Sequence, residues 1–181
     1  MKLHFVSRLL LPSLVCLILS GMLPASATPA IETGFSPEGS ALQLVLKVVN
    51  TAQQNIRLMG YSFTSPAVVR SLISAKRRGV DIQVVLDEKA NVGKASVAAM
   101  DLLVNTGIPV RTANSFKALH DKVIIVGGKN TQVGSFNFSQ AAVQSNSENV
   151  LIIWGDFTVV QAYLQHWQSR WNKGTDWRSS Y

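Results

Sequence analysis

The spacing of hydrophobic residues predicts a chain in which strands and helices alternate before ending in a hairpin and a last helix. Apolar residues at helical spacing predict helices that begin after Ser36 and Ser65, and further helices over residues 96–106 and 157–171. Short apolar or alternating runs predict strands over residues 56–63, 80–86, 108–111, 119–126, 131–138 and 148–154. We therefore expect a single α/β domain, with a mixed, largely parallel β-sheet flanked by helices on both faces.

The N-terminus has the pattern of a secretory signal peptide. Lys2 and Arg8 precede a mostly apolar run over residues 9–19, and the small residues Ala25-Ser26-Ala27 follow it. The alternative is an uncleaved anchor, but the run is shorter than the roughly 20 residues of a membrane span. We expect a signal peptide over residues 1–27, a linker over 28–35 and one domain over 36–181.

Cleavage after Ala27 would leave 154 of the 181 residues, enough for one domain with a core of its own. It would remove the only cysteine and lower Lys+Arg from 17 to 15, against 10 acidic residues, for a net charge of +5. The mature protein would be periplasmic or secreted, without stable membrane insertion. A basic exported domain favours polyanionic partners such as nucleic acid or anionic lipid, and charge alone does not choose between them.

The predicted hairpin gathers four polar side chains. A two-residue turn at Gly128-Lys129 would place Lys122 opposite Ser135 and His120 opposite Asn137. Directly opposed Cβ atoms lie roughly 4.5–5.5 Å apart, and residues two apart share a face. An imidazole, an ammonium, a hydroxyl and an amide would share one patch that suits a phosphate. The alternative is an ordinary strand with a wet polar face.

These residues also form a known signature. The spacing of His120, Lys122, Gly134-Ser135 and Asn137 resembles the HxK…GSxN motif of the phospholipase D superfamily. The segments around Phe35, Tyr61, Glu148 and the C-terminus are similar to the small secreted bacterial endonuclease branch, so the resemblance covers nearly the whole chain after the leader. It implies the fold of one phospholipase D half and phosphodiesterase activity without a cofactor.

The chemistry of a phosphodiester gives each residue a candidate role. Neutral imidazole is a competent nucleophile, so His120 is the candidate to attack phosphorus. Lys122 would neutralise phosphate charge, and Ser135 and Asn137 would donate hydrogen bonds to phosphate oxygens. Glu148 could accept a hydrogen bond from the imidazole; it could also be an ordinary surface acid, and the resemblance favours the catalytic role.

A single copy of the motif lacks a proton donor for the leaving group, because Lys122, with a reference pKa near 10.4, is a poor acid. Superfamily enzymes combine two copies, so the resemblance implies a homodimer in which a second His120 is the acid. The acidic position of the motif holds Gly127. Seven strand residues span roughly 23 Å at about 3.3 Å each, so residue 127 would lie at the turn, away from the phosphate.

Three functions remain open at this point. The first is a non-specific nuclease for DNA or RNA, the second a phospholipase D acting on phosphatidylcholine-type lipids, and the third a non-catalytic nucleic-acid-binding domain. The sequence lacks a zinc-protease motif, cysteine pairs and dense Asp/Glu/His spacing, so no metal site is predicted. The expected size, the lack of a clear apolar or aromatic membrane-docking face outside the leader, and the resemblance together favour the nuclease.

Overall fold

The computed structural model describes residues 30–179, so the predicted signal peptide, residues 1–27, lies outside the described residues. The helices are α1 (Ser40–Asn50), α2 (Pro66–Arg77), α3 (Lys94–Asn105), α4 (Gln140–Gln144) and α5 (Phe157–Trp171), with a short 3₁₀ turn over Lys89–Asn91. The strands are β1 (Ala30–Ser36), β2 (Asn55–Gly60), β3 (Asp81–Asp87), β4 (Val110–Ala113), β5 (Lys122–Val126), β6 (Asn130–Gly134), β7 (Glu148–Trp154) and β8 (Thr175–Asp176). None of the helices within this part of the chain is long and apolar enough to cross a membrane.

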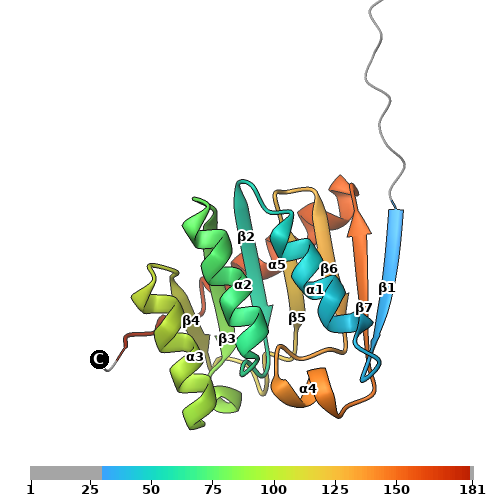
Figure 1. The fold of residues 1–181 in the computed structure, drawn as a ribbon. Coiled ribbons are helices and arrows are strands. Elements are labelled where there is room, and N and C mark those ends of the chain that lie inside the picture. Colours follow the sequence, from blue (N-terminus) through green and yellow to red (C-terminus); the bar gives the residue numbers. More distant parts are fainter. Residues whose placement is uncertain (1–29, 180–181) are drawn as a thin grey trace, which may run out of the picture.

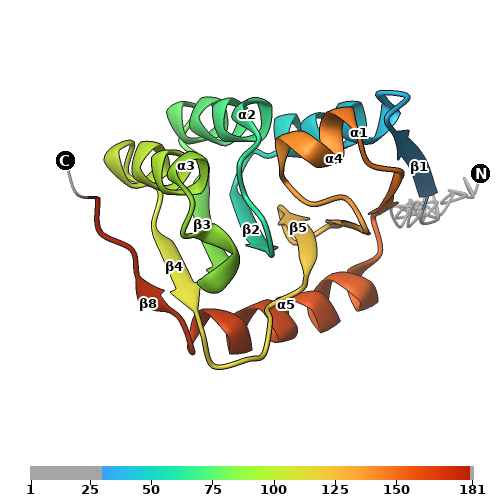
Figure 2. The same cartoon turned by 90° about the horizontal axis from the view of Figure 1, so that it is seen from below.

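All eight strands form one sheet in the order β1-β7-β6-β5-β2-β3-β4-β8. Helices α1, α2 and α3 cover one face and α5 crosses the other (Figures 1 and 2). The predicted α/β domain with a mixed sheet between helices is therefore confirmed.

The expectation that the sheet is largely parallel is wrong. Only β2 with β3 and β3 with β4 pair in parallel, while the other five pairings are antiparallel. Parallel neighbours need a long crossover connection, and only α2 and α3 supply one between neighbouring strands. From β4 onward the chain returns through loops and hairpins, so β5, β6 and β7 run in alternating directions.

The predicted linker is also wrong over most of its length. Residues 30–36 form the edge strand β1, which pairs antiparallel with β7 from Ala30 opposite Trp154 to Ser36 opposite Glu148. Large apolar side chains on this strand remain exposed, Ile31 at 63 % and Phe35 at 53 %, so no burial pattern marked it as a strand. Helix α1 consequently begins at Ser40, and its N-cap, Gly39, lies three residues after the predicted cap at Ser36.

The core lies on both sides of the sheet, which explains the continuous apolar runs of the central strands. On β3 and β5, Val84 and Ile124 face the layer under α1, α2 and α3. Their neighbours Val85 and Ile125 face the layer under α5, where Trp167 is 2 % exposed and its Nε1–H donates to the carbonyl of Leu58 at 2.9 Å. Strands buried on both faces keep no polar side, so they read as unbroken hydrophobic runs.

Candidate active site

The predicted site residues come together in one pocket. A cavity of about 440 Å³ is lined by residues of the loop before β5 and of β5, β6, β7 and the segment after β6. Its lining residues are His120, Lys122, Gly134, Ser135, Asn137 and Glu148. The six residues are those of the predicted motif together with the acid from the following strand.

The hairpin that carries these residues has a different register from the predicted one. The prediction paired Gly127 with Asn130, whereas the structure pairs Val126 with Asn130 across a three-residue turn. A slip of one residue sends the side chains of a regular strand to the opposite face of the sheet. On regular strands this shift would separate Lys122 from Ser135.

A break in the strand after Gly134 compensates for the shifted register. The N–H groups of Ser135 and Phe136 both donate to the carbonyl of Asn149, at 3.1 and 3.4 Å, in the pattern of a β-bulge. A Cβ atom on Gly134 would overlap this same carbonyl oxygen, so the bulge requires glycine there. The break lets Ser135 and Asn137 line the pocket with Lys122.

Lys122 lines the pocket but is almost fully buried. The residue is 6 % exposed, and its Nζ donates to the carbonyl of His120 at 2.7 Å and lies 5.4 Å from the centre of the Tyr61 ring. Burial lowers the pKa of Lys122 below the ordinary 10.5, and the nearby charges of Asp121 and Glu148 oppose this change. A charge held at low exposure acts on a phosphate with little screening by water.

The imidazole of His120 is exposed at the mouth of the pocket and packs against one aromatic ring. The rings of His120 and Tyr61 are 4.7 Å apart between centroids and tilted by 60°. Tyr61 directly follows β2, the neighbour of β5 in the sheet, and its ring lies beside both His120 and Lys122. The role of Tyr61 was missed at the sequence level, where its segment entered only through the resemblance.

The other polar side chains of the pocket are those of Ser135, Asn137 and Glu148. Ser135 Oγ accepts the N–H of Asn149 at 3.0 Å, which leaves its own hydrogen free to donate. Asn137 Oδ1 is buried without a hydrogen-bond partner among the described residues. The carboxylate of Glu148 accepts from Asn146 Nδ2 at 2.9 Å. Its hydrogen bond to the His120 imidazole stays a prediction.

The second histidine of the described residues lies outside this pocket. His166 Nε2 is 3.1 Å from Asp121 Oδ1, a contact that joins α5 to the start of the hairpin. This placement leaves His120 as the histidine of the pocket.

A buried carboxylate fixes the chain just before His120. Asp87, at the end of β3, is 3 % exposed, and its two oxygens accept the N–H groups of Ala90 at 2.8 Å and Leu119 at 2.7 Å. The Asp87 carboxylate therefore joins the turn that follows β3 to the loop that carries His120.

A buried amide extends the same support to Tyr61. Asn91 is 1 % exposed, its Oδ1 accepts the N–H of Phe63, and its Nδ2 donates to the carbonyls of Tyr61 and Asp87 at 2.6 and 2.7 Å. Asp87 and Asn91 together tie the ends of β2 and β3 to the loop that carries His120. Neither belongs to the motif, so spacing gave no signal for them.

We expect Asp87→Asn to reduce both stability and turnover. The substitution places an amide N–H₂ where two backbone N–H groups need acceptors, which costs about 1–3 kcal/mol of unfolding free energy. Loosening Leu119 would displace His120 and lower kcat about 10-fold. Urea unfolding and steady-state hydrolysis measure the two effects. Glu88→Gln, at the partly exposed neighbour, is the control; an unchanged kcat in folded Asp87→Asn would contradict this role.

Comparison with known proteins agrees with this geometry. A family model described as cardiolipin synthase, PLD-like domain, matches residues 45–171. The crystal structure of a phospholipase D family member, Nuc from Salmonella typhimurium, superimposes with a TM-score of 0.83 at 49 % identity, covering 84 % of this chain and 100 % of that chain. The chain belongs to the phospholipase D superfamily. The likeness to Nuc places it in the small bacterial branch.

Curated relatives extend the phospholipase D superfamily match to longer proteins. A phospholipase D of Rickettsia bellii is 32 % identical over 140 residues, 77 % of this chain and 68 % of that protein. The mitochondrial cardiolipin hydrolase of Xenopus tropicalis is 31 % identical over 134 residues, 74 % of this chain and 62 % of that protein. The protein is therefore an enzyme of the superfamily, a phosphodiesterase.

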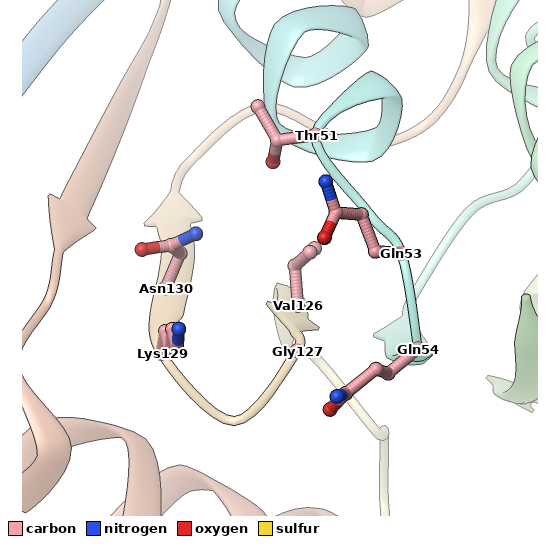
Figure 3. A pocket seen from close by; sticks show the side chains of 7 residues that line it. All are labelled: Thr51, Gln53, Gln54, Val126, Gly127, Lys129 and Asn130. Atoms are coloured by element: carbon pink, nitrogen blue, oxygen red, sulfur yellow. The ribbon is translucent and has the colours of Figure 1, made fainter.

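The departure from the superfamily motif, Gly127, lies far from the pocket. Gly127 is in the turn between β5 and β6, at the top of Figure 1, whereas α4, which follows the site end of β6, is at the bottom. Figure 3 shows it in a different, polar pocket with Lys129, Asn130 and Gln53. Its N–H donates to the carbonyl of Asn55 at 3.0 Å. The prediction that residue 127 lies at the turn is confirmed.

We expect Gly127→Asp to leave turnover nearly unchanged. A Cβ at this position meets no atom within 4 Å, and φ is +60°, a conformation that Asp tolerates better than most residues. The change in kcat/KM should stay within about 2-fold, as for a surface substitution. Steady-state hydrolysis checks this, and a thousandfold rise would show that the acidic position takes part in the chemistry.

The environment of Lys122 predicts a shift in the alkaline limb of the pH–rate profile. The nearby Glu148 charge raises the pKa of Lys122 against the lowering by burial. Glu148→Gln removes that charge, so the pKa of Lys122 should fall further and activity should be lost at lower pH as Lys122 deprotonates. Hydrolysis of a small diester across pH measures the limb, with Glu32→Gln as control. An unmoved limb would contradict the coupling.

The described residues contain no evident metal centre. Within residues 30–179, His, Cys, Asp and Glu do not gather in any group of three or more that could hold a metal ion. Metal-independent hydrolysis stays a prediction, and activity in a chelator tests it.

Proposed function

We propose that the protein is a metal-independent endonuclease that hydrolyses DNA, with RNA as a second polynucleotide substrate. The observation that carries the proposal is the convergence of His120, Lys122, Ser135 and Asn137 on one open pocket of a basic domain. A nuclease without sequence preference needs a reactive centre and positive charge along a phosphate backbone, and this chain offers both. It would act in the periplasm or outside the cell once residues 1–27 are removed.

In the proposed reaction an imidazole nitrogen of His120 attacks phosphorus. An N–P bond forms while the P–O bond to the sugar oxygen of the leaving DNA fragment breaks, and Lys122, Ser135 and Asn137 hold the non-bridging oxygens. A second imidazole gives its proton to the leaving oxygen. The same imidazole then takes a proton from water, whose oxygen attacks phosphorus and releases His120.

The second imidazole requires a second chain, because the pocket contains one histidine. We therefore include a two-fold homodimer in the proposal, with the two His120 residues meeting at the interface. The exposure of His120 at the pocket mouth is compatible with such a meeting.

Subunit mixing tests the dimer. When wild-type and His120→Ala chains are unfolded together in equal amounts and refolded, only wild-type pairs keep both histidines, so activity should fall to about one quarter of the all-wild-type value. Independent monomers would keep about one half. A fully active monomer in gel filtration would also contradict the dimer.

Substrate class is tested with the mature protein and His120→Ala, each incubated with plasmid DNA, RNA and phosphatidylcholine vesicles in EDTA. Nicking that the variant loses, without choline release, is the expected result. Choline release without nicking would replace the proposal with a phospholipase. DNA binding without any cleavage would replace it with a non-catalytic binding domain.

A phospholipid substrate is the second candidate because of two observations. The curated relatives include proteins named phospholipase D and mitochondrial cardiolipin hydrolase. A mostly apolar groove of about 440 Å³ also runs between α2 and α3, with Val69, Ile73 and Leu102 among its lining residues. The likeness to Nuc, in the small bacterial branch, favours the nuclease over this candidate.

A further inference from the structure

Two cations converge on one aromatic ring in the loop that leads to His120. The ring of Phe116, between β4 and β5, lies 5.0 Å from the guanidinium of Arg170 and 4.9 Å from the ammonium of Lys173. Arg170 is in the last turn of α5 and Lys173 follows it. Figure 2 shows the β4–β5 loop running alongside α5.

The two positive charges are close together and uncompensated. Because each lies about 5 Å from the same ring centre, they are no more than about 10 Å apart, within one Debye length at 0.1 M salt. The ion pairs of residues 30–179 do not include either cation, and Arg170 donates to the hydroxyl of Ser169. The dipole of α5 favours cations at this end but does not explain an aromatic ring within about 5 Å of both.

This cluster is close to the reactive histidine. Phe116 and His120 are four residues apart, so their Cα atoms are separated by at most about 14 Å. The loop is also fixed between them, since the buried Asp87 carboxylate accepts the N–H of Leu119 at 2.7 Å. A phosphate held at His120 would therefore have its neighbours along a polymer within reach of the cluster, whereas a lone phosphate group would not engage both places.

We propose that Phe116, Arg170 and Lys173 form a subsite for the flanking phosphates of a nucleic-acid strand bound at His120. The ring positions both cations, and the cations contact backbone phosphates one or more nucleotides away from the cleaved bond. This inference rests on the proposed nuclease function and identifies the surface that binds the polymer outside the reactive pocket.

The test separates polymer binding from chemistry. Binding of a fluorescent single-stranded 20-nucleotide DNA is measured at several salt concentrations, in the His120→Ala background to prevent cleavage. Hydrolysis of bis(p-nitrophenyl) phosphate, a small diester, is measured with His120 intact. Three variants are compared in each assay: Arg170→Gln/Lys173→Gln, Phe116→Leu, and the control Arg77→Gln/Lys129→Gln, which removes the same charge from α2 and the distant β5–β6 turn.

Arg170→Gln/Lys173→Gln should weaken DNA binding about 10-fold at 0.1 M salt and reduce the slope of log K against log salt by about 1.4, since each phosphate contact on a single strand contributes about 0.7. Phe116→Leu should weaken binding about 3-fold, in the range of a lost cation–π contact. Small-diester hydrolysis should stay within about 2-fold of wild type in both, because neither variant touches the reactive pocket.

Equal weakening in the control pair would overturn the subsite, since it would show an effect of net charge alone. Unchanged DNA binding in a folded Arg170→Gln/Lys173→Gln protein would overturn it as well. Failure of the proposed function looks different: the wild-type chain would hydrolyse the small diester while neither binding nor cutting nucleic acid.

Discussion

His120→Ala should lower phosphodiester hydrolysis by at least about 10³-fold, because it removes the imidazole that we propose as the nucleophile. Lys122, Ser135 and Asn137 would still bind a phosphate, so affinity for the substrate should change much less than kcat. Single-turnover hydrolysis in EDTA measures the loss, with binding followed separately.

The matched control is His166→Ala. This histidine contacts Asp121 outside the pocket, so its loss should cost some stability and leave kcat within about 2-fold. A similar loss in both variants would point to general disruption. A residual rate within tenfold of wild type in His120→Ala would remove His120 from the mechanism.

Lys122→Gln should reduce kcat by about 10²–10³-fold, the effect of losing one preorganised donor to a developing charge. The glutamine can still donate a hydrogen bond to a neighbour, but it cannot neutralise the phosphate. The ammonium is held in place by the His120 carbonyl and the Tyr61 ring. No other lysine or arginine lines the pocket, so no other side chain there can replace its charge.

Lys129→Gln is the control for Lys122→Gln, because Lys129 lies in the exposed turn at the other end of β5 and β6. It should keep nearly full activity on a small diester. Comparison of kcat in the two variants tests the charge, and comparison of their unfolding midpoints shows whether Lys122→Gln remains folded. A folded Lys122→Gln protein with normal kcat would contradict the assigned role.

The sequence was sufficient for the elements that combine strong periodicity with clear end signals. Strand β7 and helix α5 have the predicted bounds, 148–154 and 157–171, and Ser65 caps α2 as expected. These segments bury one or both faces, so hydrophobic spacing reflects their environment. The edge strand β1 buries little and gave no such pattern.

Strand direction and register could not be read from the same pattern. The turn after Val126 has three residues, and the break at Gly134 restores the site by a contact with Asn149 that is remote in sequence. The predicted grouping of the motif residues was right, although the register that led to it was wrong. The number of residues between Lys122 and Ser135 in the motif already allows for the bulge after Gly134. An argument that assumes regular strands leaves this bulge out.

The residues that support the site were invisible for a related reason. Asp87 and Asn91 act through backbone groups of Leu119, Tyr61 and Phe63, which only the folded sheet brings near. A buried carboxylate and amide bonded to backbone leave no spacing signature.

The central claim is that His120 forms a covalent bond to the phosphate of a nucleic acid. The most direct measurement is rapid acid-free quenching of the wild-type protein with end-labelled DNA in EDTA, followed by denaturing electrophoresis and peptide mapping. We predict a transient label that is stable to base, lost in acid, located on His120 and absent from His120→Ala. Two results would contradict the account. One is DNA cleavage with no such adduct at any time during the first turnover, and the other is an adduct on another residue.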